Sequence, residues 1–191
     1  VRISKGKMTL WAPNQVKIKK GQNIWKRVSH LLGTQSNTNG WLLPESLRGK
    51  LFRPQAEDAA KKLVSFLQGK TEDASPAVSL LVGLGPGLTP SGDDYLIGVL
   101  LALDAIGEND LFLEISKHVS SYASENTNTI SYSHLNAVVE TRTANDLLHN
   151  FLLALQMNKD LSKATEALLT HGHFSGEDAL SGILTVLYIL G

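Results

Sequence analysis

The sequence predicts an α+β protein that is mainly α, in which a small strand-bearing N-terminal part precedes a helical domain. Residues 8–10 and 16–18 alternate apolar with polar side chains, a pattern typical of short half-buried strands. From residue 91 almost to the end of the chain, apolar residues recur at the spacing of buried helix faces. These two patterns divide the chain into a mixed part and a helical part.

The charge of the chain divides in the same way. Residues 1–70 hold 14 Lys and Arg against 3 acids, a net charge of +11, whereas residues 71–191 carry a net charge of −11. We therefore expect a basic part over 1–70 and an acidic helical domain over 75–191. Opposite fields favour docking of the two parts on each other or on other subunits, and a basic part also attracts anionic substrates. Nucleic acid is a poorer fit, because the basic residues are not interleaved with aromatic ones.

The individual elements follow from local signals. Apolar residues at helical spacing predict a helix over 23–32, and Pro54 opens a second helix that ends near Leu67. Between them lies a long loop rich in Ser, Asn and Gly. The apolar run at 77–83 has a length that suits either a buried strand or a helical turn. Six further helices are expected over residues 91–105, 110–123, 132–141, 143–156, 161–171 and 176–190.

The composition limits the class of protein. The chain of 191 residues has no Cys, which excludes disulfides, thiolate metal sites and Cys nucleophiles. The absence of Cys fits the cytoplasmic protein that we expect, and neither a run of 18 apolar residues, which a membrane span would need, nor a secretory signal is visible. Because the chain begins at Val1 rather than Met, we expect its N-terminal part to be incomplete.

The most informative segment runs from Gly83 to Asp94 and reads GLGPGLTPSGDD. Its glycines allow tight turns and close approach to a ligand, and the helix that follows offers unpaired amide groups at its N-terminus. Part of this segment is repeated further along the chain: SGDDYLIGVL at 91–100 aligns without gaps on SGEDALSGIL at 175–184. In both copies, Ser, Asp and Gly at positions i, i+3 and i+7 share one helix face.

Two interpretations of this repeated motif stay open. Ser-x-x-Asp is a variant of the capping box, which stabilises a helix start by about 1 kcal/mol and needs no further function. In the first copy, Thr89 followed by Pro90 is a competing cap. Capping does not explain the glycine two turns into each helix, which costs about 1 kcal/mol relative to Ala. We infer that the two helices cross at Gly98 and Gly182, which brings both N-termini and their carboxylates to one shared site.

The shared site is expected to bind a small anion or a metal. Helix N-termini and glycine turns attract phosphate or carboxylate, whereas paired carboxylates attract Mg²⁺ or basic side chains. The predicted catalytic residues are Ser91, Asp94, His173, Ser175 and Asp178. The predicted anion-binding residues are Gly85, Gly87, Thr89, Ser91, Gly92, Thr129, Arg142 and Gly176, and the predicted ligands of Mg²⁺ are Asp93, Asp94 and Asp178.

Three further features bear on this site. His171 suits the end of a helix, whereas His173 is placed to carry a proton or to donate to an anion, and zinc is disfavoured. The polar stretch 127–134 is either a solvated loop with a hydroxyl cap or a second set of hydroxyls at the site, with His134 pointing inward. Arg142, one of four cations in the acidic domain, is expected to pair with an acid of the motif or with a substrate carboxylate.

Several common sites are excluded by spacing. The glycine segment lacks the Lys-Ser/Thr ending of a P-loop and the spacing of a dinucleotide fingerprint. Neither motif serine sits in a Gly-x-Ser-x-Gly elbow, so a serine nucleophile is disfavoured. A small phosphorylated or carboxylated metabolite fits the segment better than a nucleotide does.

Together, GLGPGLTPSGDD at 83–94 and HGHFSGED at 171–178 resemble the motifs of a bacterial family associated with AllH. AllH is a subunit of the oxamate carbamoyltransferase of anaerobic allantoin breakdown, a branch of purine degradation. The resemblance covers residues 75–190. Where the family commonly has two hydroxyls before the second glycine, this chain has Phe174 and Ser175, which leaves Ser175 as the candidate hydroxyl.

The resemblance implies phosphorolysis of oxalurate to oxamate and carbamoyl phosphate by three different subunits acting together. The implied partners are the other subunits and a small anionic substrate with phosphate, carbamoyl or carboxylate groups. In such a site, backbone donors of residues 85–92 would stabilise developing charge, Asp94 and Asp178 would hold Mg²⁺ or orient donors, and His173 would move a proton. The alternatives are a non-catalytic scaffolding subunit and a stand-alone Mg²⁺-dependent hydrolase or transferase.

Overall fold

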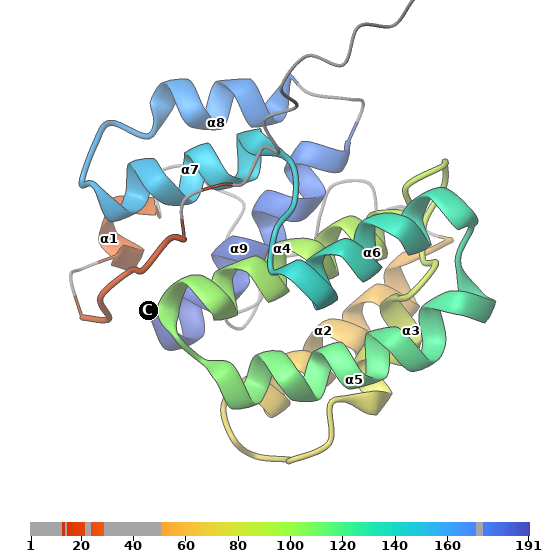
Figure 1. Ribbon diagram of the computed structural model, residues 1–191. Helices are drawn as coiled ribbons and strands as arrows, with labels where there is room; N and C mark the ends of the chain where they lie inside the picture. Colours follow the sequence, from red (N-terminus) through yellow and green to blue (C-terminus); the bar gives the residue numbers. More distant parts are fainter. Residues whose placement is uncertain (1–12, 14, 22–23, 29–50, 171–173) are drawn as a thin grey trace, which may run out of the picture.

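The computed structural model describes residues 13, 15–21, 24–28, 51–170 and 174–191, and in this part of the chain α-helices are joined by turns and loops without any strand (Figure 1). Its helices are α1 (Ile24–Val28), α2 (Arg53–Leu67), α3 (Ser75–Leu81), α4 (Ser91–Ile106), α5 (Asn109–Asn126), α6 (Thr129–Thr141), α7 (Asp146–Gln156), α8 (Ser162–Leu169) and α9 (Ser175–Leu190). None of the described helices is both long and apolar enough to cross a membrane. The six helices predicted after residue 91 are all present, with starts displaced by up to three residues.

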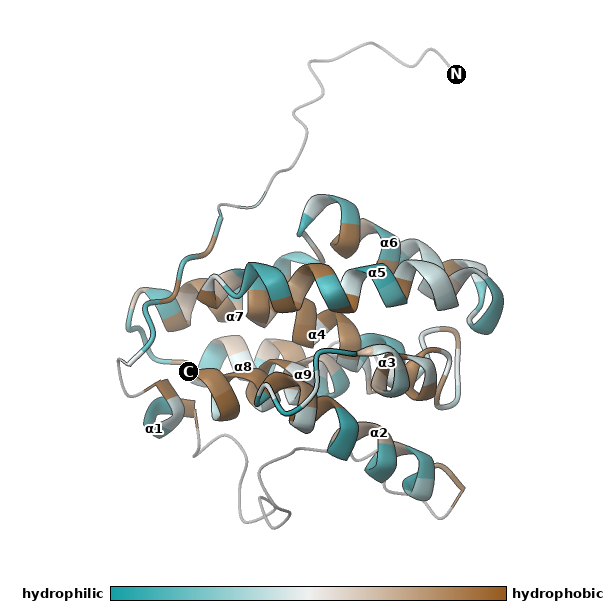
Figure 2. Ribbon diagram, turned by 90° about the horizontal axis from the view of Figure 1, so that it is seen from below, coloured by the Kyte–Doolittle hydropathy of each residue, from teal (hydrophilic) through white to brown (hydrophobic). Residues whose placement is uncertain are grey.

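The centre of the fold is α4, which the other helices surround (Figures 1 and 2). Every residue of α4 is buried, as expected for a helix that is apolar on nearly all sides. It packs most extensively against α9, and α5, α6 and α7 also contact it. The helix ends where Gly107 adopts a left-handed conformation with φ of +80°, a common way for helices to stop.

The backbones of α4 and α9 are in direct contact at two glycines. A Cβ atom added to Gly98 would lie 1.9 Å from the carbonyl oxygen of Ala179, and one added to Gly182 would lie 2.1 Å from that of Tyr95. Tyr95 and Ala179 occupy equivalent positions in the two motifs. The contact is therefore reciprocal, and the predicted crossing of the two helices at their glycines is confirmed.

A second pair of glycines lets α4 and α9, the two helices that begin with the repeated motif, pack closely against the helix that precedes each of them. A Cβ atom on Gly92 would lie 2.1 Å from the carbonyl oxygen of Leu81, the last residue of α3. A Cβ atom on Gly176 would lie 1.8 Å from the carbonyl oxygen of Leu168, near the end of α8. The two motifs thus repeat a helix–loop–helix arrangement as well as a sequence.

The predicted α+β class is wrong for the described residues, which contain no strand. Residues 8–10 lie outside the described part of the chain. Val16 and Ile18 are buried while Lys17 is exposed, so the alternating pattern did indicate burial. The amide of Ile18, however, donates to the carbonyl of Ala105 over 2.7 Å. The segment is therefore paired with the C-terminal turn of α4, whose last carbonyls lack partners within the helix, and not with another strand.

The apolar run before the glycine segment, left open between strand and helix, forms α3. The buried residues of α2 share one hydrophobic core with those of the later helices. The expected boundary between a basic part and an acidic domain stays a prediction.

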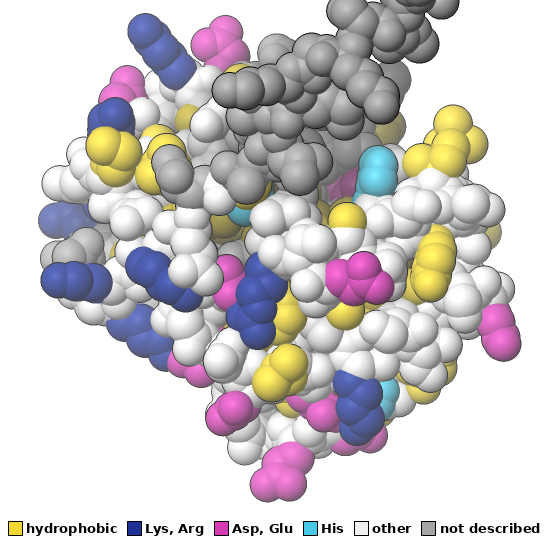
Figure 3. Space-filling model, viewed as in Figure 1, with side chains coloured by type: hydrophobic (Ala, Val, Ile, Leu, Met, Phe, Trp, Pro, Cys, Tyr) yellow, Lys and Arg dark blue, Asp and Glu magenta, His cyan; other side chains and the backbone are white. Residues whose placement is uncertain are grey.

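Basic residues of the N-terminal part contact the helical part directly. Arg27 donates to the carbonyl of Leu155 over 2.7 Å, and Lys20 forms an ion pair with Glu108. On the face shown in Figure 3, Lys and Arg side chains gather over α1, α7 and α8. These contacts are of the kind expected if the two oppositely charged parts dock on each other.

Replacing Gly98 with Ala should destabilise the protein strongly, because the new methyl group would overlap the backbone of α9. We expect the free energy of unfolding to fall by about 3 kcal/mol or more, measured by urea denaturation. Gly107→Ala is the control, because this glycine has a positive φ but nothing within 4 Å of its added Cβ. It should cost only about 1–2 kcal/mol. Equal losses in the two variants would contradict the close crossing.

Candidate functional site

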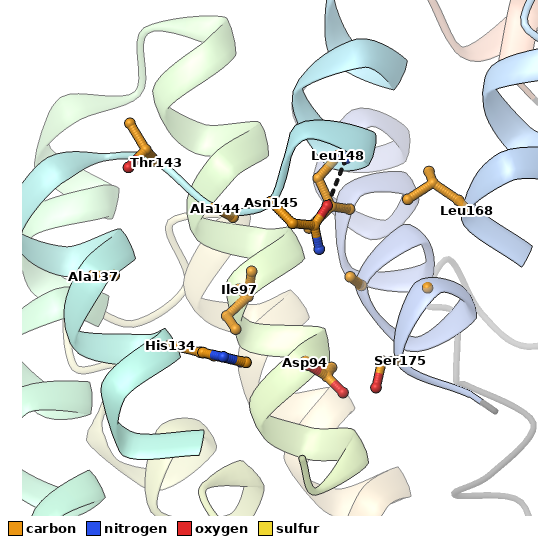
Figure 4. A pocket seen from close by; sticks show the side chains of 12 residues that line it. Asp94, Ile97, His134, Ala137, Thr143, Ala144, Asn145, Leu148, Leu168 and Ser175 are labelled. Carbon is orange, nitrogen blue, oxygen red and sulfur yellow. Dashed lines mark hydrogen bonds between the residues drawn. The ribbon is translucent and has the colours of Figure 1, made fainter. Parts of the chain in front are cut away.

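A cavity of about 210 Å³ opens where the first turns of α4 and α9 meet α6, α7 and α8 (Figure 4). Its wall combines a few polar side chains with a larger apolar surface. The lining residues are Asp94, Ile97, His134, Ala137, Thr143, Ala144, Asn145, Leu148, Leu168, Ser175, Gly176 and Ala179. Both motifs therefore contribute to one cavity, as the predicted crossing required.

Asp94 is the acidic residue of the cavity wall. It is only 6% exposed, and its Oδ2 atom is buried without a hydrogen-bond partner. Burial raises the pKa of this carboxyl group from its usual 3.8 to about 6, against the opposing effect of hydrogen bonding by Ser175 and Thr89. In Figure 4 the carboxylate is turned toward Ser175, with the ring of His134 on α6 opposite. A carboxyl group with this pKa can take up or release a proton near neutral pH.

The hydroxyl groups of the motifs do not cap their helices. The N-cap positions of α4 and α9 are Pro90 and Phe174, and neither helix start has a side-chain cap hydrogen bond. The capping-box interpretation of Ser91 and Ser175 is therefore wrong. Instead, the hydroxyl of Thr89 lies 2.8 Å from that of Ser175, which joins the loop before α4 to the first residue of α9.

Asp93, the other carboxylate of the first motif, has a different environment. It is fully buried and accepts three hydrogen bonds. The amide of Gly83 donates to Oδ1 over 2.8 Å, while the hydroxyls of Thr127 and Ser131 donate to Oδ2 over 2.5 and 2.6 Å. Asp93 thus ties the glycine segment to the junction of α5 and α6. Because these protein donors engage both carboxylate oxygens, we assign Asp93 a structural role.

The glycine segment is held in part by its surroundings, although a Cβ added to Gly87 would meet nothing within 4 Å. Gly83 has a φ of +73°, and an added Cβ would lie 2.0 Å from the carbonyl oxygen of Asn126. The amide of Gly92, one of the predicted anion donors, is bonded to the carbonyl of Leu84 over 2.8 Å. Asn128, which caps α6, also donates to the carbonyl of Leu88. Backbone donors of this segment are in part already used within the protein.

The other predicted residues are distributed as follows. Ser175 and Gly176 line the cavity with Asp94, and Thr89 contacts Ser175. His173 and His171 lie outside the described residues. The remaining predicted residues, which do not belong to the cavity wall, are Gly85, Gly87, Ser91, Gly92, Asp93, Thr129, Arg142 and Asp178.

Arg142 has a partner that the sequence did not indicate. It forms an ion pair of 2.6 Å with Asp104, near the opposite end of α4 from the motif, and its guanidinium lies 4.1 Å from the centre of the Phe112 ring. The expectation of a motif acid as its partner is wrong. Arg142 and Asp104 line a separate, smaller cavity of about 140 Å³.

The predicted metal ligands are not gathered around the cavity. Asp94 lines it, Asp93 is engaged by three protein donors, and Asp178 is buried outside its wall. Mg²⁺ at this site stays a prediction that would depend on Asp94 and on oxygen atoms of a substrate. Elsewhere, Asp73, Glu114 and His118 bring possible ligand atoms within 4.8 Å of one another on the surface.

The polar stretch at 127–134 follows neither of its two alternatives in full, because its cap is the side chain of Asn128 and its hydroxyls do not line the cavity. Thr127 and Ser131 donate to the structural Asp93, whereas His134 lines the cavity. The apolar wall was not predicted from sequence. Much of it comes from α6, α7 and α8, where Ala137, Leu148 and Leu168 carry no signal beyond that of ordinary helix residues.

Comparison with known proteins places this arrangement in a family. The family described as oxamate carbamoyltransferase subunit AllH matches residues 81–187 of the chain. The matched region begins at the end of α3 and covers α4 to α8 and most of α9. It therefore includes every residue of the cavity wall. No solved structure matches the chain.

The raised pKa of Asp94 predicts a specific dependence of stability on pH. Between pH 3.8 and about 6 the unfolded chain loses this proton before the folded protein does, so stability falls as pH rises through that window. Asp94→Asn removes this contribution. The free energy of unfolding of the variant, relative to the unmodified protein, should therefore rise by up to about 3 kcal/mol between pH 4 and pH 7. Urea denaturation across this range measures it, and a difference that does not change with pH would contradict the assignment.

Asp93→Ala should damage folding far more than Asp94→Ala does. The change leaves one amide and two hydroxyls without their acceptor, and we expect a loss of about 3 kcal/mol or more in the free energy of unfolding. Asp94→Ala is the matched comparison, because one of its oxygens has no partner to lose. Denaturation of both variants at pH 7 tests this, and a smaller loss for Asp93→Ala would show that the three-donor contact is not structural.

Proposed function

The chain belongs to the AllH family of oxamate carbamoyltransferase subunits, and we propose that it contributes the cavity beside Asp94 to the site of carbamoyl transfer. One observation carries the proposal. A buried carboxyl group with an unpartnered oxygen faces a cavity at the place where the two motifs meet. Burying such a group costs free energy, and groups of this kind are typical of functional sites.

The reaction that the family name suggests needs a proton to move. In phosphorolysis of oxalurate, an oxygen of hydrogen phosphate attacks the carbamoyl carbon, and the bond from that carbon to the inner nitrogen breaks. The products are carbamoyl phosphate and oxamate, and the proton of hydrogen phosphate ends on the nitrogen that leaves. Asp94, with a pKa of about 6, and His134 across the cavity are the side chains that we assign to this transfer.

The site is proposed to be completed by a partner subunit. The family name describes a subunit, and no Lys or Arg belongs to the cavity wall among the described residues. Two large apolar side chains flank the contact between Thr89 and Ser175: Leu88 is 69% exposed and Phe174 is 40% exposed. Exposed apolar groups beside a site are typical of surfaces that another protein covers. A partner bound here would bring basic groups to the mouth of the cavity.

A scaffolding role without catalysis is the second candidate, and a specific observation favours it. The four motif glycines at 92, 98, 176 and 182 are all explained by close packing against backbone carbonyls. On this view the repeat locks helices together and presents a surface to catalytic partners. The two candidates differ in what they require of Asp94, because packing does not need its unpartnered oxygen.

Asp94→Asn should abolish most of the activity of the enzyme reconstituted with its partner subunits. We expect the rate of carbamoyl phosphate formation from oxalurate and phosphate to fall by about 100-fold or more at saturating substrate, since proton transfer contributes at least that much. The assay is run with and without Mg²⁺. Asp110→Asn, an exposed acid in the first turn of α5, is the control and should keep full activity. A fully active Asp94→Asn enzyme with normal assembly would favour the scaffolding role.

A further inference from the structure

The cavity beside Asp94 has a wall whose charge does not suit an anion. Its one acidic side chain is Asp94, and no Lys or Arg accompanies it among the described residues. On the face shown in Figure 3, basic side chains gather over α1, α7 and α8, and Arg142 at the C-terminal end of α6 is paired with Asp104. A phosphate or carboxylate placed against Asp94 would meet a like charge in a poorly solvated space, and no described Lys or Arg of the wall would offset it.

The unpartnered oxygen of Asp94 could accept a hydrogen bond from a ligand. The residue is more than nine-tenths buried and lines the cavity, yet its Oδ2 atom has no partner. The hydroxyls of Thr89 and Ser175 are engaged with each other and with the same carboxylate, so the donor has to come from elsewhere. An ionised carboxylate accepts only, so the missing partner is an N–H or an O–H donor.

The rest of the wall limits the size and polarity of that donor. Most of the remaining wall is apolar, and Figure 4 shows Ala137, Ala144 and Leu148 above Asp94. Besides Asp94, the polar side chains of the wall are His134, Thr143, Asn145 and Ser175. A cavity of about 210 Å³ with this lining admits a small planar group and favours one without charge.

We infer that the cavity binds the neutral amide end of a small molecule, the –CO–NH₂ group of a carbamoyl or oxamoyl compound, with its nitrogen donating to Oδ2 of Asp94. This rests on the proposed function and deepens it. The substrate is held by its nitrogen end, and its carboxylate or phosphate end points away from Asp94 toward the mouth of the cavity. The site is therefore selective for amides over the corresponding acids.

Oxamate and oxalate form a matched pair of probes for this selectivity. The two ions have nearly the same shape, and differ in that an amide group of oxamate is replaced by a second carboxylate in oxalate. Each is titrated into the isotopically labelled full chain at pH of about 8, where Asp94 is ionised, while the amide resonances of Gly176 and Ala179 report binding at the cavity. We expect oxamate to bind at least about 10-fold more tightly than oxalate, because a site built to accept a hydrogen bond rejects the ligand that lacks the donor.

Asp94→Asn should remove this preference, because an amide side chain can donate to oxalate as well as accept from oxamate. The ratio of the two dissociation constants should fall to within about 2-fold, and Asp110→Asn should leave it unchanged. The inference is overturned if oxalate or phosphate binds the unmodified protein as tightly as oxamate, or if the preference survives in Asp94→Asn. It is also overturned if the preference requires Mg²⁺, or if oxamate shifts no cavity resonance in the full chain and in the reconstituted enzyme.

This test is separate from that of catalysis, since no turnover enters the measurement. If Asp94→Asn loses activity but the unmodified protein shows no preference for oxamate, the proposed function stands and the amide site is refuted. If the unmodified protein prefers oxamate and Asp94→Asn loses that preference but keeps full activity, the amide site stands and the proposed catalytic role of Asp94 does not.

Discussion

The direct contact between the backbones of α4 and α9 is the constraint on which the rest of the structure depends. Side chains at 98 or 182 would separate the two helices, and only glycine lets each approach the other's carbonyl groups. Because α4 is buried over its whole length, any shift of α9 would disturb the helices packed around α4 as well. The same contact sets the distance between the first turns of the helices. It thereby brings Thr89 to Ser175 and closes the cavity around Asp94.

Asp93 and Asp94, the adjacent acids of the first motif, lie in different environments although they belong to one helix turn. Successive residues of an α-helix point about 100° apart, so Asp93 and Asp94 face different neighbours. Asp93 meets the donors of the α5–α6 junction and the glycine segment, and its charge is balanced by three hydrogen bonds. Asp94 meets α9 and the cavity, and it stays incompletely bonded. A sequence motif with two carboxylates therefore contains one structural group and one group, Asp94, that we propose to be reactive.

The sequence predicted well those features that depend on local pattern, such as the helix starts at Ser91 and Ser175 and the crossing at the glycines. It failed where the partner of a group lies far along the chain. Alternation around Val16 and Ile18 indicated burial, but the same alternation cannot tell a neighbouring strand from the end of a helix. The hydroxyl of Ser175 and the guanidinium of Arg142 likewise bond to groups that no spacing rule connects to them. The apolar half of the cavity was beyond prediction, because its residues differ from core residues only in where the fold leaves a space.

The reciprocal contact of Gly98 with Ala179 and of Gly182 with Tyr95 has the form of an isologous interface, in which equivalent residues of two copies touch across a two-fold axis. Two identical chains that met in this way would share every substitution, and their sites would come in equal pairs. Joined in one chain, the two helices are free to diverge. Tyr95 stands where the other copy has Ala179, and its hydroxyl donates to Thr185 inside the core. The chain can therefore expose one carboxylate, Asp94, to a cavity while its counterpart, Asp178, is buried outside the cavity wall, an asymmetry that a symmetric dimer cannot build.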